Sequence, residues 1–144
     1  MINIICIGKI KEKYLIELVE DYKSRISKYH KINIIEIADN NIDKETDTIL
    51  KFIKPNDYVI SLAIEGKQMD SIEFSNLINE TFIHYSTIDF IIGESNGLSD
   101  AIKNKSNLLL SFSKLTYPHG LFRGILLEQI YRSFKIINNE TYHK

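Results

Sequence analysis

The sequence predicts an α/β fold, with a mostly parallel sheet and helices on both of its faces. Three observations support this prediction. Short isoleucine-rich runs of strand length recur along the chain, helical apolar patterns stand between them, and 144 residues is a common size for one domain. Strands that alternate with helices form parallel sheets, because each helix returns the chain to the same edge. We therefore expect residues 1–144 to form a single domain.

The first 57 residues predict two strands and two helices. Residues 2–7 and 32–38 are apolar and have the length of a strand. Between them, apolar side chains recur at spacings of three and four, which predicts a helix with one face against the sheet. These side chains are Tyr14, Leu15, Leu18, Val19, Tyr22 and Ile26. A shorter helix around Ile49 ends before a turn at Pro55.

The remaining residues predict three strands and three helices. The strands are residues 58–64, 88–92 and 108–112. Asp70 and Glu73 occupy the capping-box positions of a helix that follows the first of these strands. A short helix follows Gly97, and the last helix covers residues 119–137 with a broad apolar face. Ligands of such folds usually bind beyond the carboxyl ends of the strands, so the loops there are the places to search for a site.

Composition places the chain among ordinary soluble proteins. No apolar run approaches the roughly 20 residues that a membrane span requires. Residues 1–7 have no basic leader and no small-residue cleavage site, so we expect no signal peptide. The single cysteine, Cys6, excludes an intramolecular disulfide and a cysteine-cluster metal site. We therefore expect a cytoplasmic protein that does not enter a membrane.

Charge is distributed unevenly along the chain. The net charge is −1, yet residues 108–144 contain five lysines and arginines against two acidic residues. Chance clustering explains this equally well, but a local basic patch would suit binding to nucleic acid. The candidates for such a patch are Lys114, Arg123, Lys135 and Lys144. For Arg123, pairing with an acidic residue is an equal alternative.

Familiar catalytic motifs are absent from the sequence. It contains no G-x-G-x-x-G dinucleotide loop, no P-loop, no H-E-x-x-H and no G-x-S-x-G. The four histidines are scattered without the spacing of metal ligands, so we expect no metal site.

Three other segments have unusual content. Gly93 and Gly97 flank a loop that would let backbone amides approach a ligand closely. Residues 113–119 join the last strand to the last helix, and Pro118 restricts the residue before it to an extended backbone. Residues 142–144 combine an aromatic ring, a titratable group and a cation. Taken singly, these are also typical of a plain turn, a helix start and a solvated tail.

The combination of motifs is more specific than its parts. In order, the chain contains I-I-G-x-x-x-G-L, S-F-S-K-L-T-Y-P-H-G-L-F-R, L-L-E-Q-I-Y-R-S-F-K-I and a terminal Y-H-K. These motifs resemble the SPOUT-class methyltransferases and, within that class, the 23S rRNA pseudouridine N3-methyltransferases of the RlmH family. The resemblance runs essentially end to end, and its most specific part is residues 112–144.

The resemblance implies a C-terminal trefoil knot whose loops bind S-adenosylmethionine (SAM) in a bent form. By position, the cofactor-binding residues would be Leu62, Gly93, Phe112, Ser113, Lys114, Leu115, Thr116 and Tyr117. It also implies a homodimer in which the partner's C-terminal tail completes the active site. The implied substrate is 23S rRNA within the assembled 70S ribosome.

The implied chemistry assigns roles to the polar residues of the last segment. Methyl transfer to N3 requires the imide anion, so a cation and a base near N3 would both help. Arg132 is our candidate for holding RNA and stabilising the anion, and His143 for accepting the proton. The RNA-binding residues would be Arg132, Tyr142, His143 and Lys144. His119 would shape the cofactor loop instead.

Two departures from the family pattern leave alternatives open. Glu94 stands where relatives usually have a second glycine, so a positive φ there would be strained. Residues 39–54 look shorter than the corresponding segment of relatives. One alternative is a SPOUT methyltransferase of another RNA, such as tRNA. The other is a dimeric nucleotide- or protein-binding module that has lost catalysis through Glu94.

Overall fold

The computed structural model describes residues 1–94 and 97–144, in which five strands alternate with five helices. The elements are β1 (Ile2–Ile7), α1 (Lys13–Ser27), β2 (Ile32–Ile37), α2 (Ile42–Phe52), β3 (Tyr58–Gln68), α3 (Ser71–His84), β4 (Ile88–Ile92), α4 (Asp100–Lys105), β5 (Leu108–Ser111) and α5 (His119–Ile137). Every strand and helix expected from the sequence is present. The second helix begins earlier than the pattern around Ile49 indicated, because Asn41 caps it by accepting a hydrogen bond from the amide of Lys44.

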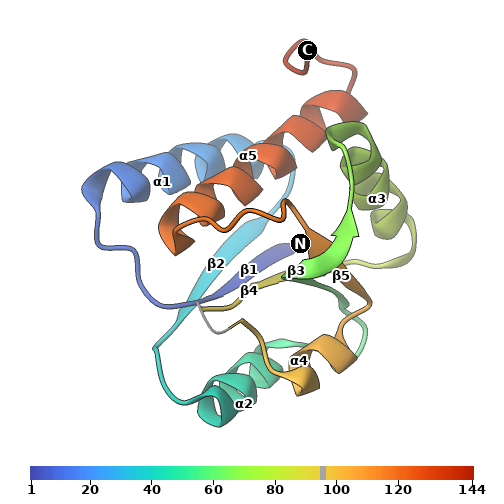
Figure 1. Cartoon of the computed structure of the whole chain (residues 1–144). Helices are drawn as coiled ribbons and strands as arrows, with labels where there is room; N and C mark the ends of the chain where they lie inside the picture. The colour runs from blue at the N-terminus through green and yellow to red at the C-terminus, as the bar shows by residue number, and fades with distance from the viewer. Residues whose placement is uncertain (95–96) are drawn as a thin grey trace.

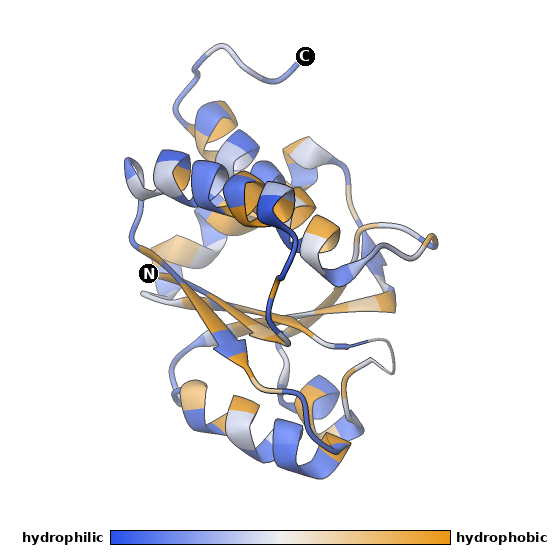
Figure 2. Ribbon diagram, turned by 90° about the vertical axis from the view of Figure 1, so that its left-hand side faces the viewer, coloured by the Kyte–Doolittle hydropathy of each residue, from blue (hydrophilic) through white to orange (hydrophobic). Residues whose placement is uncertain are grey.

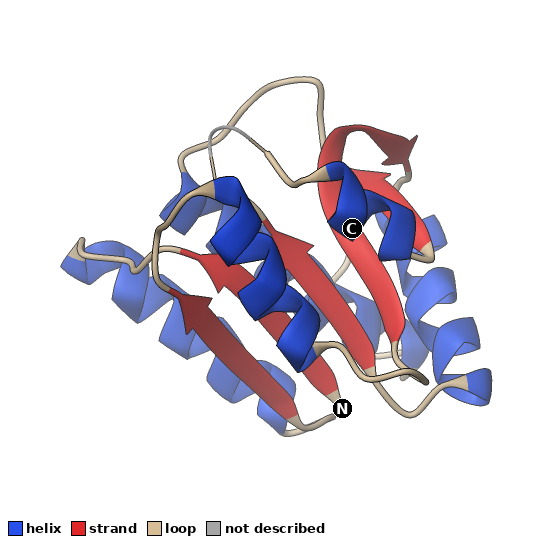
Figure 3. Cartoon of the chain, turned by 90° about the horizontal axis from the view of Figure 1, so that it is seen from below, coloured by secondary structure: helices blue, strands red, loops and turns tan. Residues whose placement is uncertain are grey.

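The strands form one sheet in the order β2-β1-β4-β3-β5, and all neighbours are parallel. Helices α1, α3 and α5 cover one face, and α2 and α4 cover the other (Figure 1). Successive crossovers run in opposite directions on opposite faces, as crossovers of a single hand must. The predicted fold class is confirmed, and the trefoil knot stays a prediction. The carboxyl ends of the strands meet at one edge, where the loops gather (Figure 3).

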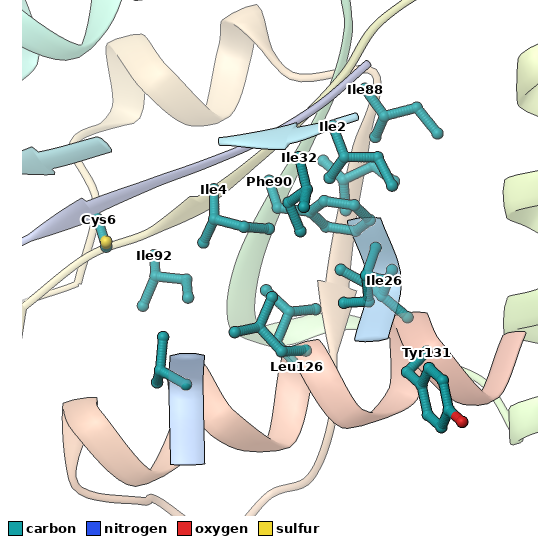
Figure 4. Close-up of a cluster of buried hydrophobic side chains, with 14 of the residues drawn as sticks. Ile2, Ile4, Cys6, Ile26, Ile32, Ile88, Phe90, Ile92, Leu126 and Tyr131 are labelled. Atoms are coloured by element: carbon teal, nitrogen blue, oxygen red, sulfur yellow. The ribbon is translucent and has the colours of Figure 1, made fainter. Parts of the chain in front are cut away.

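Each face of the sheet has its own apolar core, because successive side chains of a strand point to opposite faces. The core between the sheet and α1, α3 and α5 contains Ile4 and Phe90 of the strands and Leu126 of α5, with their neighbours (Figure 4). Under α2 and α4 lie Ile5 and Ile91. The helices are hydrophobic toward the sheet and hydrophilic outside (Figure 2). In the described part of the chain, no helix is both long and apolar enough to cross a membrane.

Strand β3 is longer than the sequence indicated, because it continues four residues past Ile64 to Gln68. Its register against β5 shifts between Leu62 and Lys67. At the shift, a Cβ atom on Gly66 would lie 2.6 Å from the carbonyl carbon of Leu109. Glycine therefore allows the end of β3 to pass against the backbone of β5. The polar residues of this extension hid it from a search for apolar runs.

Candidate active site

A cavity of about 370 Å³ opens at the carboxyl edge of the sheet. Its walls come from the ends of β3, β4 and β5 and from the loops that follow β4 and β5. Helix α5 contributes its first turn through His119 and Phe122. The cavity therefore lies where ligands of parallel α/β sheets usually bind, and its size is typical of small-molecule pockets.

Seven of the eight predicted cofactor residues line this cavity. They are Leu62, Gly93, Phe112, Ser113, Leu115, Thr116 and Tyr117. Lys114 is exposed and is not among the lining residues. Sequence reasoning missed other parts of the wall, chiefly residues 63–65, Lys103 and Leu98. Residues 63–65 belong to the carboxyl half of β3, at the edge where the fold class predicts ligands, whereas the ion pair between Lys103 and Glu65, at 2.7 Å, has no local signal in the sequence.

The loops of the wall are held by short polar and aromatic contacts. Gly93 allows a close approach of two chain segments, because a Cβ there would lie 2.9 Å from the carbonyl of Gly97. In the loop after β5, the hydroxyl of Ser113 accepts a hydrogen bond from the amide of Leu115 at 2.9 Å. The ring of Phe122 packs edge-on against Phe112 and stacks on Tyr117. The loop is therefore fixed to the first turn of α5.

Glu94 is one of the charged groups in the cavity wall. Among the described residues, only Gly8, Gly97 and Asn139 have a positive φ, so Glu94 has no left-handed strain. Its carboxylate lies 4.0 Å from Nε2 of His119. Burial and the neighbouring carboxyl of Asp39 raise the pKa of Glu94, while His119 opposes them.

Arg123 is buried and does not belong to a surface patch. Its Nη1 donates to Oε2 of Glu36 at 2.7 Å, and its Nη2 donates to the carbonyl of Gly8 at 3.4 Å. The same Glu36 oxygen accepts from the amide of Ile10. The alternative of pairing with an acid is thus confirmed for Arg123, and the patch prediction is wrong. The pair ties α5 to β2 and to the loop after β1.

At the middle of α5, one carboxylate oxygen of Glu128 accepts hydrogen bonds from three donors. It accepts from Nε and Nη2 of Arg132 and from the hydroxyl of Tyr142, the last at 3.2 Å. The guanidinium of Arg132 also lies over the ring of Tyr142, 4.9 Å from its centroid. Glu128 raises the pKa of Arg132, which keeps it charged. Arg132 and Tyr142, both predicted site residues, are thereby brought together.

His143 joins this cluster through its Nδ1 atom, 3.1 Å from Nη1 of Arg132. A guanidinium only donates, so Nδ1 accepts and Nε2 carries the hydrogen of a neutral ring. Lys144 follows as an exposed residue. Lys135, a predicted patch residue, is paired with Glu140 at 3.1 Å. Of the predicted RNA-binding set, Arg132, Tyr142 and His143 form one cluster, and Lys144 extends it.

The cavity lies at the first turn of α5, whereas the Arg132 cluster extends from the middle of that helix into the tail after it. Arg132 stands thirteen positions after His119, or about 20 Å along the helix at 1.5 Å per residue. The C-terminus lies beyond the end of α5 that is remote from the cavity (Figure 1). A single chain therefore does not bring the predicted catalytic residues to the predicted cofactor residues. Among the described residues, no group of three metal-binding side chains is present.

Comparison with known proteins agrees with this geometry. Residues 1–143 match a family model described as "Predicted SPOUT methyltransferase". The chain is 48% identical to the ribosomal RNA large subunit methyltransferase H of Clostridium tetani over 157 residues, which cover 99% of each chain. It is 47% identical to the protein of the same name from Caldicellulosiruptor saccharolyticus, which covers 100% of each chain. These alignments are longer than 144 residues, so the relatives have residues that this chain lacks. That residues 39–54 are the shortened segment stays a prediction.

Solved structures agree at the level of the fold. The SpoU methyltransferase AviRb from Streptomyces viridochromogenes superposes with a TM-score of 0.53 at 10% identity, over 98% of this chain and 62% of that one. At this identity the likeness concerns the fold alone. Together with the family model and the relatives, it shows that the chain belongs to the SPOUT methyltransferases, in the family of the ribosomal RNA large subunit methyltransferase H proteins.

Proposed function

We propose that this protein transfers a methyl group from SAM to N3 of a pseudouridine in 23S rRNA, acting in the cytoplasm on the assembled 70S ribosome. The cavity carries the proposal, because it combines a small-molecule volume with walls from the ends of three strands and from the two loops that follow β4 and β5. The names of the relatives support ribosomal RNA as the substrate, rather than tRNA. Membership of a methyltransferase family argues against a purely non-catalytic module.

The cavity fits the proposed cofactor by its chemistry. SAM supplies an electrophilic methyl group on a sulfonium. Gly93 lets the chain at Gly97 pack against the end of β4, because a Cβ on Gly93 would lie 2.9 Å from the Gly97 carbonyl, and both glycines line the cavity. The aromatic and aliphatic wall of Leu62, Phe112 and Tyr117 excludes water from an apolar ligand surface. Glu94 and the ion pair of Glu65 with Lys103 supply polar partners at the edge.

The Arg132 cluster supplies the chemistry that methylation of an imide nitrogen needs. The N3 proton must leave before or while the new N–C bond forms, and negative charge then spreads over the adjacent carbonyl oxygens. Arg132 stabilises this charge, and Glu128 acts as a positioning residue that fixes the guanidinium by two hydrogen bonds. His143 accepts the N3 proton on Nδ1 after its ring has moved away from Arg132, because the hydrogen bond between Nδ1 and the guanidinium is then broken.

A homodimer would unite the two halves of the site. Beside the cavity, Leu115, Tyr117 and Leu121 are exposed by 72%, 37% and 38%. An axis of two-fold symmetry near the middle of α5 would place the apolar end of one helix beside the polar end of its partner. The Arg132 cluster of the partner would then stand at this cavity, about 20 Å from its counterpart on the same chain.

The reaction is tested by methyl incorporation from labelled SAM into unmethylated 70S ribosomes, with bulk tRNA as the competing substrate. We expect incorporation into ribosomes only, at one pseudouridine of 23S rRNA, and mass spectrometry of nuclease fragments identifies the nucleotide. Incorporation into tRNA, or at a uridine of another position, would contradict the proposal. Removing residues 142–144, or Arg132→Ala, should abolish transfer while SAM binding measured by calorimetry stays unchanged.

The shared site makes a sharper prediction with two inactive variants. Gly93→Val deforms the cavity of its own chain, because its Cβ would meet the lining residues Gly97 and Leu98 at 2.9 Å, and Arg132→Ala removes the cation from its own chain. When the two are co-expressed, half of the dimers are mixed, and each mixed dimer has one complete site of two. We therefore expect about a quarter of wild-type activity from the mixture, because each isologous site takes one part from each chain. If both parts came from the same chain, the mixture would stay inactive.

A further inference from the structure

The segment after β1 presents three lysines at alternate positions. Lys9, Lys11 and Lys13 are exposed, and Ile10 between the first two is buried in the main core. Because Ile10 points inward, both neighbouring ammonium groups project to the solvent side. The ring of Tyr14, the next residue, is 70% exposed. Residues 7–14, whose sequence is I-G-K-I-K-E-K-Y, have no role in the proposed chemistry, and they form a basic surface with an aromatic ring at its end.

This surface is held in place. The amide of Ile10 donates to Glu36, the carboxylate that also binds the buried Arg123. Arg123 in turn reaches the carbonyl of Gly8, whose own amide donates to Ile37 at 2.7 Å. The lysine segment is thus fixed between β2 and α5 before any ligand arrives, so that binding costs little ordering entropy.

The lysine segment also begins beside the cavity. The carboxylate of Glu94 lies 3.1 Å from the place of a Cβ atom on Gly8, the residue before Lys9. Lys11 is three residues farther, which puts its backbone within about 10 Å of Gly8 even if the chain is extended. A polymer bound with one nucleotide at the cavity would therefore reach these lysines with its neighbouring phosphates.

Three other cations of the chain are already neutralised, whereas Lys114, in the loop after β5, is exposed and has no ion pair among the described residues. Lys103 pairs with Glu65, Arg123 with Glu36, and Lys135 with Glu140. Within the described part of the chain, no carboxylate lies at ion-pair distance from Lys9 or Lys11, and Lys13 has one exposed partner, Glu17, at 3.9 Å. An unpaired surface cation is the group that gains most from replacing the counterions of a phosphate backbone.

We propose that the segment from Lys9 to Tyr14 is an RNA-contact surface, in which the three lysines bind phosphates and the Tyr14 ring stacks on an unpaired base. This inference rests on the proposed function, since it takes RNA as the substrate. It explains how a chain with a net charge of −1 holds a polyanion: a few free cations stand beside the cavity. Base stacking on an aromatic ring is tolerant of sequence, so the segment adds affinity and leaves the choice of nucleotide to the cavity.

The test compares two triple variants of equal charge. Lys9→Ala, Lys11→Ala and Lys13→Ala together remove the surface, whereas Lys28→Ala, Lys31→Ala and Lys51→Ala remove three exposed lysines elsewhere. For the first, we expect the KM for unmethylated 70S ribosomes to rise roughly tenfold or more. The slope of log affinity against log salt should fall by about two, at about 0.7 per lost contact with single-stranded RNA. The control should match wild type in both.

Two further measurements separate the ways in which the idea can fail. The Kd for SAM should stay within about twofold of wild type in both triple variants, because neither touches the cavity. Tyr14→Ala should weaken ribosome binding at least about fivefold, and Tyr14→Phe should restore it, since a stacked base is worth about 1–3 kcal/mol. If wild type methylates ribosomes but the lysine variant behaves as the control does, the inference is overturned. If wild type binds neither SAM nor ribosomes, the proposed function itself has failed.

Discussion

Glu94 puts a titratable carboxyl in the wall of the cavity, next to the glycine that brings the chain segments together. A ligand with a sulfonium and an ammonium group is cationic, and the thioether left after transfer has lost the sulfonium charge. A carboxylate in the wall therefore favours the substrate form over the product form when it is ionised. Because burial and the Asp39 carboxyl raise the pKa of Glu94, this carboxyl stays protonated to a higher pH than an ordinary glutamate does.

From this we predict a pH-dependent affinity for SAM. Below the pKa of Glu94 the group is neutral, so the affinity should rise as pH increases from 5 to 7.5. For Glu94→Gln this rise should disappear. At pH 7.5 its affinity for SAM should be roughly threefold to tenfold lower than that of wild type, because the attraction of a wall carboxylate for the sulfonium is lost. Calorimetry at the two pH values measures it, with the thioether product as a second ligand. Glu80→Gln, on the exposed side of α3, is the control. If Glu94→Gln keeps the wild-type pH profile, the role of Glu94 in SAM affinity is refuted.

At the scale of single residues, the sequence indicated which residues belong to the candidate site better than it indicated their burial and their partners. The residues of the cavity wall and of the Arg132 cluster were found because they stand in ordered motifs. The burial of Arg123 was not predictable, because its partner Glu36 lies 87 residues away. Glu128 differs, because its pair with Arg132 has the i, i+4 spacing of neighbours on one helix, whereas its hydrogen bond from Tyr142 joins the helix to the tail. Pairing across the fold decides which charges remain free, and local sequence does not contain it.

Among the elements, β3 has the most unusual path. Its last residues pass over β5 where Gly66 meets the backbone of Leu109 and Leu110. Both strands then supply residues to the wall of the cavity. The absence of a side chain at Gly66 therefore affects both the stability of the sheet and the shape of the cavity.

Gly66→Ala should separate these strands. The added methyl would meet backbone atoms at 2.6–2.7 Å, and backbone moves only as a whole segment. We expect a loss of about 1–3 kcal/mol in the free energy of unfolding and a weaker affinity for SAM, measured by thermal melting and calorimetry. Gly97→Ala gives the contrast, because a Cβ at Gly97 would meet no atom within 4 Å. Its φ of 74° is in the left-handed region, so this variant should lose only about 1 kcal/mol of the free energy of unfolding, through backbone strain. Equal melting of Gly66→Ala and wild type would show that the strands can part freely.

Elements with local signals were predicted well. Asp70 and Glu73 form both hydrogen bonds of the capping box that their spacing indicated. The five strands were recognised because a sheet covered on both faces requires continuous apolar runs. The extension of β3 was missed for the same reason: it lies beyond the covered part of the sheet, where polar residues suffice.

For the whole molecule, stability depends on a polar ladder across the strands at the amino edge. Asn33 donates to Asn3 at 3.1 Å, and Asn3 donates to the buried Asp89 at 2.9 Å. The second oxygen of Asp89 has no partner among the described residues. Burial, and then the neighbouring carboxyl of Asp57, raises the pKa of Asp89 to about 7.

This ladder predicts that the protein becomes less stable as pH rises. The unfolded chain has the ordinary pKa of 3.8, so the penalty of the buried charge is absent below pH 4 and complete above pH 7. At pH 8, the free energy of unfolding of Asp89→Asn should exceed that of wild type by on the order of 2 kcal/mol, which thermal melting measures. At pH 4 the two proteins should be equally stable. Asp47→Asn, an exposed change on α2, should show no such trend. A difference that does not vary with pH would point to packing instead of charge.

The walls of the cavity come from distant parts of the chain, and this sets when the enzyme can begin to work. Translation delivers β3 early, but β5 and α5 arrive last, and α5 fills the space between α1 and α3. Until residue 137 has left the ribosome, the apolar faces of α1 and α3 lack their cover, and a nascent chain in that state is a client for chaperones. The cavity is therefore complete only when the last strand and the last helix have joined the sheet.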